Sequence, residues 1–247
     1  MDARPSEFFE AKASPRISAS SVIPASDPDR FNPPPLNQLH AETVTRRSPS
    51  RIVGGPIKRA FDILVAGGAL LALSPFLLGV WAAVRIDSPG PGFFRQRRSG
   101  FQGRPFYILK FRTMKTCETR TITQAMNGDT RTTPLGRTLR RLSIDELPQL
   151  INVLKGEMSL IGPRPHALAH DRQFSTMDRA YAGRYRARPG ISGLAQVSGS
   201  RGRTETPEKV AERLKYDLAY VRNWSLHMDI SIALRTVLML LKDRSAF

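Results

Sequence analysis

The sequence predicts a monotopic, membrane-associated α/β protein that is mostly helical and contains a small β-hairpin. An apolar run without a charge extends from Ile63 to Val84, and roughly 20 such residues suffice for a helix across the bilayer core. Two short segments within residues 92–114 are typical of paired strands. Residues 226–242 carry the apolar period of an amphipathic helix.

The composition indicates an anionic partner. The chain has 247 residues and a formal net charge of +17, which suits nucleic acid, anionic lipid or a phosphorylated substrate. Its single cysteine excludes an intrachain disulfide and fits a reducing compartment. Composition alone leaves membrane and nucleic acid open. No base-stacking or groove-reading module is visible, however, so we expect no nucleic-acid partner and assign the basic excess to phosphate and lipid.

Three regions follow one another along the chain. Residues 1–52 are rich in Pro, Ser, Ala and Arg without any period, so we predict a disordered N-terminal tail. Residues 53–86 hold the apolar run and are predicted to form a membrane hairpin. Residues 87–247 are predicted to form a cytoplasmic catalytic domain that ends in the amphipathic helix.

The apolar run is predicted to enter the membrane and return. Ser74 and Pro75 lie at its centre, and proline there removes a backbone donor and kinks the helix. Basic residues flank the run on both sides, so a spanning helix would leave one basic cluster against the positive-inside bias. We therefore expect a re-entrant helix–break–helix on the cytoplasmic face. A spanning helix is the alternative, since many of these tolerate proline.

The rest of the chain alternates strands and helices. We expect strands at 92–98 and 104–114 around the turn at 99–103. Helices are expected at 134–142, 145–155, 207–222 and 226–242. The last helix has an apolar stripe that includes Ile230, Leu234 and Leu241. It is expected either to lie in the membrane interface or to dock on the protein's own core.

The acidic pair Asp145-Glu146 follows a run of arginines and is the first catalytic candidate. Ser143 and Glu146 match a capping box, which is the structural interpretation of the same residues. Pro148 is tolerated only in a first turn, so the helix is expected to start near Asp145. The helix dipole and the arginines would keep the carboxylates ionised. Such a carboxylate suits attack on phosphorus or binding of a hard cation.

Two arginines next to prolines are candidates for phosphate binding. Arg164 lies between two prolines in LIGPRP, and Arg188 precedes Pro189 in a second such segment. Neighbouring prolines restrict the backbone, and the planar guanidinium matches phosphate oxygens. The alternative is a rigid loop with an incidental arginine.

Five segments in a fixed order carry a family resemblance. They are IKRAFDILVAGGALLALSPF, KFRTM, LRRLSIDELPQLINVLKGEMSLIGPRP, RPGISGLAQVSG and YDLAYVRNWSLHMDI. Together they resemble the signature blocks of the bacterial sugar transferase family, the monotopic phosphoglycosyl transferases, over about residues 56–243. The short form with one membrane segment resembles the hexose-1-phosphate transferases that initiate exopolysaccharide repeat units.

The resemblance implies an enzyme at the cytoplasmic face of the cell inner membrane, with its membrane helix broken at Ser74-Pro75. It would transfer a sugar-1-phosphate, with glucose or galactose favoured, from a UDP-sugar to undecaprenyl phosphate and release UMP. Asp145 would be the nucleophile that forms an aspartyl-phosphosugar intermediate. Glu146 would assist it, and Mg²⁺ would bind at Asp145 and Glu146.

The resemblance also extends to binding residues. Arg140 and Arg164 match positions of the family's phosphate-binding site, and Asp217 matches a further acidic position. The family often has Asn-Gly-Arg-Asn where this chain has Ser-Gly-Ser-Arg, so Arg201 either substitutes through a loop adjustment or that contact is lost. The candidate substrate- and phosphate-binding residues are Arg112, Arg140, Arg164, Arg188, Arg201 and Asp217.

Two alternatives belong to other functional classes. A non-catalytic, membrane-anchored basic protein would bind anionic lipid or nucleic acid without depending on Asp145. A membrane-bound hydrolase would pass the phosphoryl group to water. The sequence does not determine the oligomeric state and is compatible with a homodimer.

Overall fold

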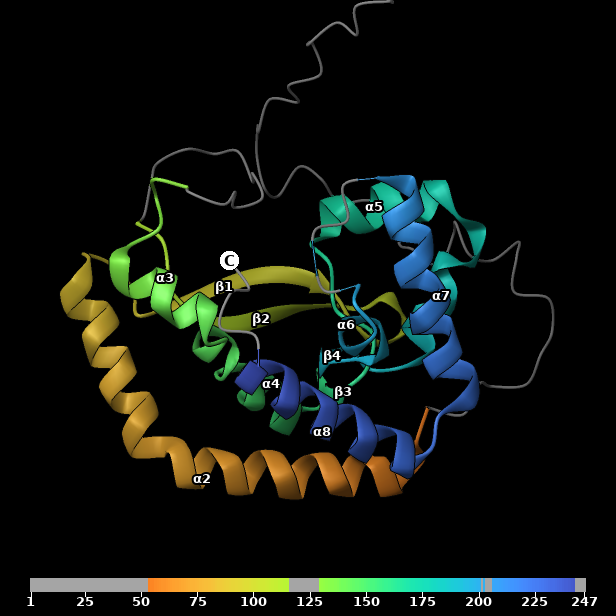
Figure 1. The fold of residues 1–247 in the computed structure, drawn as a ribbon, viewed down its shortest axis with the longest axis horizontal. Helices are drawn as coiled ribbons and strands as arrows, with labels where there is room; N and C mark the ends of the chain where they lie inside the picture. The colour runs from red at the N-terminus through yellow and green to blue at the C-terminus, as the bar shows by residue number, and fades with distance from the viewer. Residues whose placement is uncertain (1–52, 116–128, 201, 203–205, 243–247) are drawn as a thin grey trace, which may run out of the picture.

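The computed structural model describes residues 53–115, 129–200, 202 and 206–242. The predicted tail at 1–52 and Arg201 lie outside the described residues, and the division into three regions stays a prediction. Helices surround two small sheets (Figure 1). In chain order the elements are α2 (Gly55–Asp87), β1 (Phe93–Ser99), η1 (Phe101–Gly103), β2 (Pro105–Phe111), α3 (Pro134–Arg141), η2 (Ile144–Glu146), α4 (Gln149–Lys155), β3 (Ser159–Ile161), α5 (Leu168–Met177), η3 (Arg179–Arg186), β4 (Gly190–Ser192), α6 (Leu194–Val197), α7 (Pro207–Asn223) and α8 (Leu226–Lys242).

The apolar run forms α2, which continues through Pro75 as one helix. Figure 1 shows α2 bent partway along its length, with one arm beside α4 and α8 and the other beside α3. Pro75 has no N–H for the carbonyl of Leu71, one turn earlier. The Ser74 hydroxyl donates to that carbonyl at 2.8 Å. The structure therefore has a bend where the sequence predicted a break, because the neighbouring serine satisfies the acceptor that proline leaves open.

The outer face of α2 is apolar and exposed. Leu64, Leu71 and Leu78 are 75%, 79% and 67% exposed. Among the described residues, α2 is the one helix long and apolar enough to cross a membrane, by length and composition. An apolar surface of this size suits contact with lipid.

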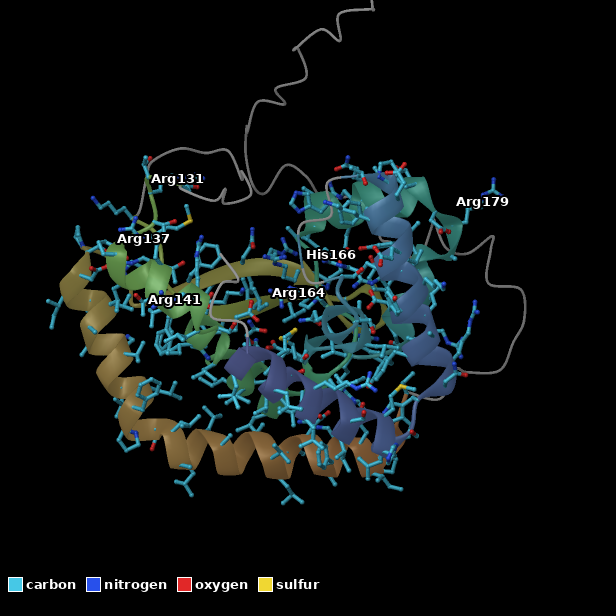
Figure 2. The ribbon with its side chains drawn as sticks, in the orientation of Figure 1. Arg131, Arg137, Arg141, Arg164, His166 and Arg179 are labelled. Carbon is cyan, nitrogen blue, oxygen red and sulfur yellow. The ribbon has the colours of Figure 1, made fainter. Side chains whose placement is uncertain are left out.

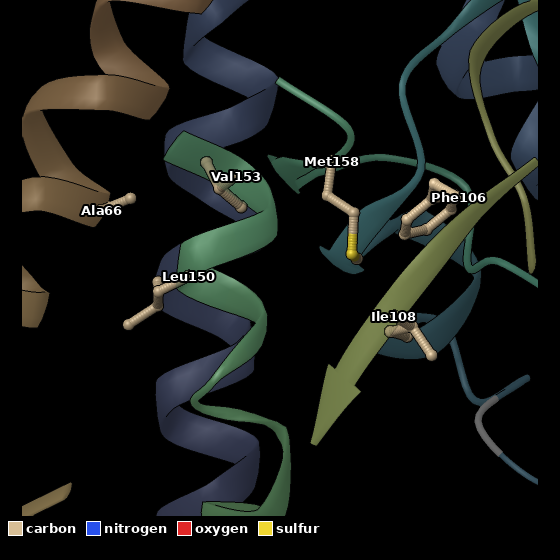
Figure 3. Close-up of a cluster of buried hydrophobic side chains, with 6 residues drawn as sticks. All are labelled: Ala66, Phe106, Ile108, Leu150, Val153 and Met158. Atoms are coloured by element: carbon tan, nitrogen blue, oxygen red, sulfur yellow. The ribbon is translucent and has the colours of Figure 1, made fainter. Parts of the chain in front are cut away.

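Both arms of α2 also pack on the rest of the protein. Ala66 of the first arm joins a buried cluster with Leu150 and Val153 of α4 (Figure 3). Phe106, Ile108 and Met158 complete that cluster. Val84 of the second arm packs with Phe111 of β2 and Leu139 of α3. The helix is thus attached to the body of the protein at both ends of the bend.

The predicted β-hairpin is confirmed, and the structure contains a second small sheet. β1 and β2 pair antiparallel, with Phe93 opposite Phe111. β3 and β4 pair in parallel, a pairing that the sequence did not predict. A Cβ on Gly190 would lie 2.1 Å from the backbone nitrogen of Gly162. Glycine at these positions therefore lets the LIGPRP and RPGISG segments meet backbone to backbone.

The predicted helices at 134–142, 207–222 and 226–242 correspond to α3, α7 and α8. In α8 the side chain of Ile232 is buried, and Asp229 forms a buried ion pair of 2.6 Å with Lys58 of α2. The predicted apolar stripe faces outward instead, and Leu234 and Leu241 are exposed. α8 thus docks on the protein's own core through Ile232, with Ala233 of the predicted stripe beside it, while most of the stripe is exposed.

Candidate active site

The acidic pair lies in η2, the short 3₁₀ turn between α3 and α4. Ser143 takes a left-handed conformation with φ of 55°, and its side chain makes no capping hydrogen bond. α4 begins only at Gln149, after Pro148. The predicted capping box and the helix start near Asp145 are thus wrong. The positive φ at Ser143 and the missing donor of Pro148 separate the acids from the helix.

Glu146 is held by two cations from distant segments. Lys110 of β2 places its Nζ 2.6 Å from Oε1. Arg164 forms a two-pronged pair, with Nη2 at 2.6 Å from Oε1 and Nη1 at 3.2 Å from Oε2. Burial by itself would raise the pKa of Glu146, but the charges of Arg164 and Lys110 outweigh it and hold the pKa well below its usual range.

Asp145 has a different environment from its neighbour. Its residue is 7% exposed, and no donor from the described residues lies within hydrogen-bonding distance of its carboxylate. Burial raises the pKa of Asp145 to about 6, and the charge of Lys110 offsets this only in part. The dipole and the arginines therefore do not lower the pKa of Asp145, because desolvation dominates there, but a carboxyl with this pKa is still mostly ionised at neutral pH.

Arg140 approaches the acidic pair from α3. Its Nε donates to the hydroxyl of Thr113 at 2.7 Å, and it contributes a favourable charge to Asp145. A Cβ on Gly136 would lie 2.1 Å from the carbonyl oxygen of Thr113. This close contact between α3 and the segment after β2 sets the position of Arg140.

The other predicted binding residues that the structure describes have their partners away from the acidic pair. Arg112 is buried and donates to the carbonyls of Pro89 at 2.7 Å and Ser88 at 2.5 Å. Arg188 donates to the carbonyl of Gly156 at 2.9 Å. Asp217 is buried and pairs with a buried arginine, described below. Of the predicted binding residues within the described part of the chain, the structure thus brings Arg140 and Arg164 to the acidic pair.

Lys110 is a site residue that the sequence reasoning did not single out, although it lies in the KFRTM block. A signal was present in the strand period. Lys110 has the same parity in β2 as Phe106 and Ile108, both of which are buried. A lysine on the inward face of a strand requires a partner, and Glu146 is that partner.

The side chains present fit a magnesium ion with its substrate. Mg²⁺ is usually bound by one or two carboxylates together with water and substrate phosphates. Asp145 offers a buried carboxylate without a donor from the described residues, beside Glu146. No group of three or more His, Cys, Asp or Glu side chains suited to a metal occurs in the described part of the chain. The carboxylates of Asp145 and Glu146 thus suit an ion that is also bound by the substrate phosphates, rather than one bound by protein ligands alone.

Figure 2 places Arg164 in the middle of the molecule, with Arg131, Arg137 and Arg179 toward its periphery.

A family profile described as bacterial sugar transferase matches residues 53–243. The chain belongs to the bacterial sugar transferase family. Membership confirms the family and the enzyme class predicted from the sequence, a phosphoglycosyl transferase.

Similar proteins cover most of the chain. A protein from Caulobacter vibrioides named UDP-glucose:undecaprenyl-phosphate glucose-1-phosphate transferase is 49% identical over 78% of this chain and 76% of its own length. A protein of the same name from Escherichia coli K12 is 47% identical over 77% of this chain. The match spans only 41% of the Escherichia coli protein. The exopolysaccharide production protein PSS of Rhizobium leguminosarum is 45% identical over 73% of this chain and 93% of its own length.

Proposed function

We propose that this protein transfers glucose-1-phosphate from UDP-glucose to undecaprenyl phosphate, releases UMP and initiates exopolysaccharide assembly. The single observation that carries the proposal is the environment of Asp145. Its buried carboxylate has no donor from the described residues, while Lys110 and Arg164 hold the adjacent Glu146. The names of the similar proteins from Caulobacter and Escherichia coli support glucose as the sugar and undecaprenyl phosphate as the acceptor. Galactose is the second candidate sugar.

The transfer proceeds in two displacements at one phosphorus. A carboxylate oxygen of Asp145 attacks the phosphorus that carries the sugar. The bond from that phosphorus to the bridging oxygen breaks, and UMP leaves with this oxygen. A phosphate oxygen of the lipid then attacks the same phosphorus and displaces Asp145, which forms the undecaprenyl diphosphate sugar. A covalent intermediate lets a soluble donor and a lipid acceptor use the site in turn.

Charge is the main obstacle, since the nucleophile and both substrates are anions. Lys110 and Arg164 bring two positive charges to the single negative charge of Glu146. The net positive charge that remains faces the phosphates. Arg140 adds a third cation on the side of Asp145. Such preorganised cations stabilise the charge that develops in phosphoryl transfer. Mg²⁺ bound by Asp145 and Glu146 would neutralise the donor's diphosphate and strengthen UMP as a leaving group.

The membrane surface of the protein fits a lipid acceptor. We propose that α2 enters the cytoplasmic leaflet of the inner membrane and returns at its bend, and that the exposed apolar stripe of α8 lies in the interface. Cysteines placed at Ile52 and Arg95, in a Cys117→Ser background, are both expected to react with an impermeant maleimide only from the cytoplasmic side. Periplasmic labelling of either one would show a spanning helix.

The nucleophile is tested with Asp145→Asn in the full-length protein. We expect lipid-linked product to fall by about 10⁴-fold or more, as for loss of other covalent nucleophiles, while membrane insertion is retained. Wild-type protein given UDP-glucose without lipid should release UMP and carry a hexose-phosphate adduct on the peptide with residue 145. Asp87→Asn, which changes an exposed acid, is the matched control and should keep full activity. Turnover of Asp145→Asn near the wild-type rate would rule out Asp145 as the nucleophile, whereas absence of product with the wild-type protein would favour the non-catalytic basic protein.

A further inference from the structure

The segment Pro163–Pro165, which presents Arg164 to Glu146, is fixed through its carbonyl groups. Prolines have no N–H, so only one of its three residues can donate from the backbone. All three carbonyls accept hydrogen bonds, each from a different element. The donors are Gly190 N of β4 to Pro163 O at 3.0 Å, Arg184 Nη2 of η3 to Arg164 O at 2.5 Å, and Arg98 Nη1 of β1 to Pro165 O at 3.2 Å.

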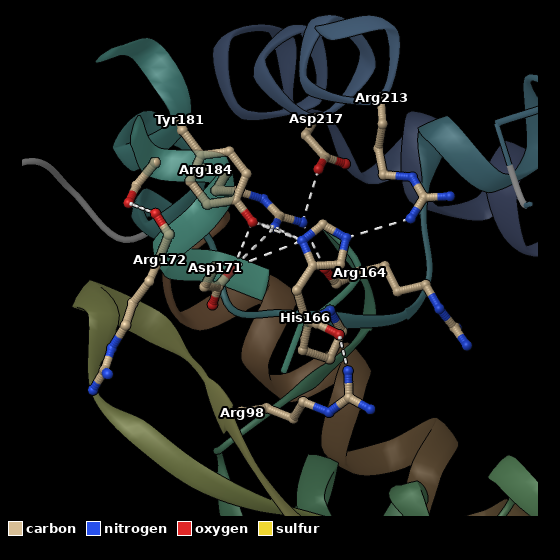
Figure 4. Close-up of polar contacts among 11 residues, drawn as sticks. Arg98, Arg164, His166, Asp171, Arg172, Tyr181, Arg184, Arg213 and Asp217 are labelled. Atoms are coloured by element: carbon tan, nitrogen blue, oxygen red, sulfur yellow. Dashed lines mark hydrogen bonds and ion pairs between the residues drawn. The ribbon is translucent and has the colours of Figure 1, made fainter. Parts of the chain in front are cut away.

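Arg184 is the central member of this set. Its side chain is 3% exposed, and Nη2 lies 2.9 Å from Oδ2 of Asp217 in α7. Its Nη1 lies 2.7 Å from Nδ1 of His166 and 2.7 Å from the hydroxyl of Tyr181 (Figure 4). A buried guanidinium is costly unless a carboxylate neutralises it. Asp217, which is equally buried, meets that requirement.

The neighbouring groups leave Arg184 few other arrangements. Burial, followed by the charge of Arg184, lowers the pKa of His166 to about 3, so His166 is neutral and can accept from Arg184. The Tyr181 hydroxyl donates its hydrogen to Asp171, so toward Arg184 its oxygen can only accept. Arg184 is therefore locked between an acid on α7 and the carbonyl of Arg164.

We propose that Arg184 and Asp217 are positioning residues for the transfer. Arg184 holds the carbonyl of Arg164, so that the Arg164 guanidinium meets Glu146 and the donor's phosphates, and Asp217 holds Arg184. This inference rests on the proposed function. It explains why Asp217 matches an acidic position of the family's site and yet pairs with Arg184 rather than with the acidic pair, since Asp217 acts through two other residues.

A purely structural role for Arg184 makes a different prediction. If Arg184 only stabilised the fold, its substitution would lower activity by the same factor whether or not the Arg164 side chain was present. If it acts through Arg164, its effect disappears once that guanidinium is removed. Non-additivity of this kind is measured by a double-mutant cycle.

The cycle uses the full-length protein in lipid nanodiscs. Arg184→Lys keeps a charge near Asp217, but the lysine side chain is one bond shorter and its ammonium does not reach the Nη2 position between Asp217 and the Arg164 carbonyl. We expect kcat/KM for UDP-glucose to fall roughly 10- to 100-fold, the usual effect of losing a supporting contact. In an Arg164→Ala background the same change should have less than about a twofold effect. Arg179→Lys, an exposed change in the same element, is the control and should leave activity unchanged (Figure 2). Equal factors in both backgrounds would overturn the proposal.

Hydrogen–deuterium exchange tests the positioning without any activity. The backbone amides of Gly162, Arg164 and His166 report on the segment. Exchange there should be faster in Arg184→Lys and in Asp217→Asn than in wild type, with α3 unchanged as the reference. Unchanged exchange in 159–166 would overturn the proposal. Absence of transferase activity in the wild type would instead refute the proposed function, and the exchange result would still judge the positioning.

Discussion

Lys110 and Arg164 approach the same oxygen of Glu146, each at 2.6 Å from Oε1. The two cations come from β2 and from the segment after β3, and their convergence leaves one positive charge in excess beside Asp145. A local excess of this kind attracts the phosphates of a nucleotide sugar. The two cations also keep Glu146 ionised, whereas burial raises the pKa of Asp145.

Lys110→Met should lower the rate of transfer while the fold is retained. The substitution keeps an unbranched apolar side chain but removes one of the two cations that pair with Glu146. We expect kcat/KM to fall roughly 10- to 1000-fold, the range for loss of one preorganised electrostatic contact. Lys155→Met, an exposed change at the end of α4, should have no effect. Wild-type kinetics for Lys110→Met would show that Arg164 alone suffices.

The first displacement should show an acid limb from Asp145. Burial raises the pKa of Asp145 to about 6, so its carboxylate binds a proton as the pH falls through that value and then cannot attack. Glu146, with its pKa held low, stays ionised over the same range. UMP release without lipid acceptor should fall about tenfold per pH unit below the apparent pKa. A rate that stays constant down to pH 4.5 would contradict this assignment.

Gly136→Ala should disturb the acidic pair from a distance. The added methyl group would lie 2.1 Å from the carbonyl oxygen of Thr113, so α3 must shift and Arg140 must move with it. We expect a loss of about 1–3 kcal/mol in the free energy of unfolding and a lower kcat/KM. Gly68→Ala, where α2 leaves open space around the added methyl group, is the matched control. Equal thermal midpoints for the two variants would contradict the close contact.

The buried pair of Lys58 and Asp229 should be essential for attachment of α2 to α8. Asp229 also accepts from Tyr220 at 2.8 Å and from Trp224 at 3.0 Å. Asp229→Asn leaves Lys58 buried without a counter-charge and should cost about 3–5 kcal/mol of unfolding free energy. Denaturation in detergent measures this loss. The double substitution Lys58→Met/Asp229→Leu should regain part of it, whereas a loss below about 1 kcal/mol for Asp229→Asn would show that water reaches the pair.

The sequence by itself determined the features that depend on neighbouring residues. Apolar period and length predicted α2 and α8, and two strand-like segments around a turn predicted the β1–β2 hairpin. The acidic pair and Arg164 were found from short motifs, and their order along the chain identified the family. These signals are local, so they survive without knowledge of what packs against them.

Only the tertiary structure decided where each charged side chain ends. Lys110 meets Glu146 across 36 positions of sequence, while Arg112, Arg188 and Asp217 have partners that no motif indicates. The parallel pairing at Gly162 and Gly190 is likewise a contact between distant segments. The state of Asp145 depends on burial, and burial is a property of the assembled core. An arginine or a carboxylate looks the same in a sequence whether it faces a substrate or a backbone carbonyl, because its partner is set by folding.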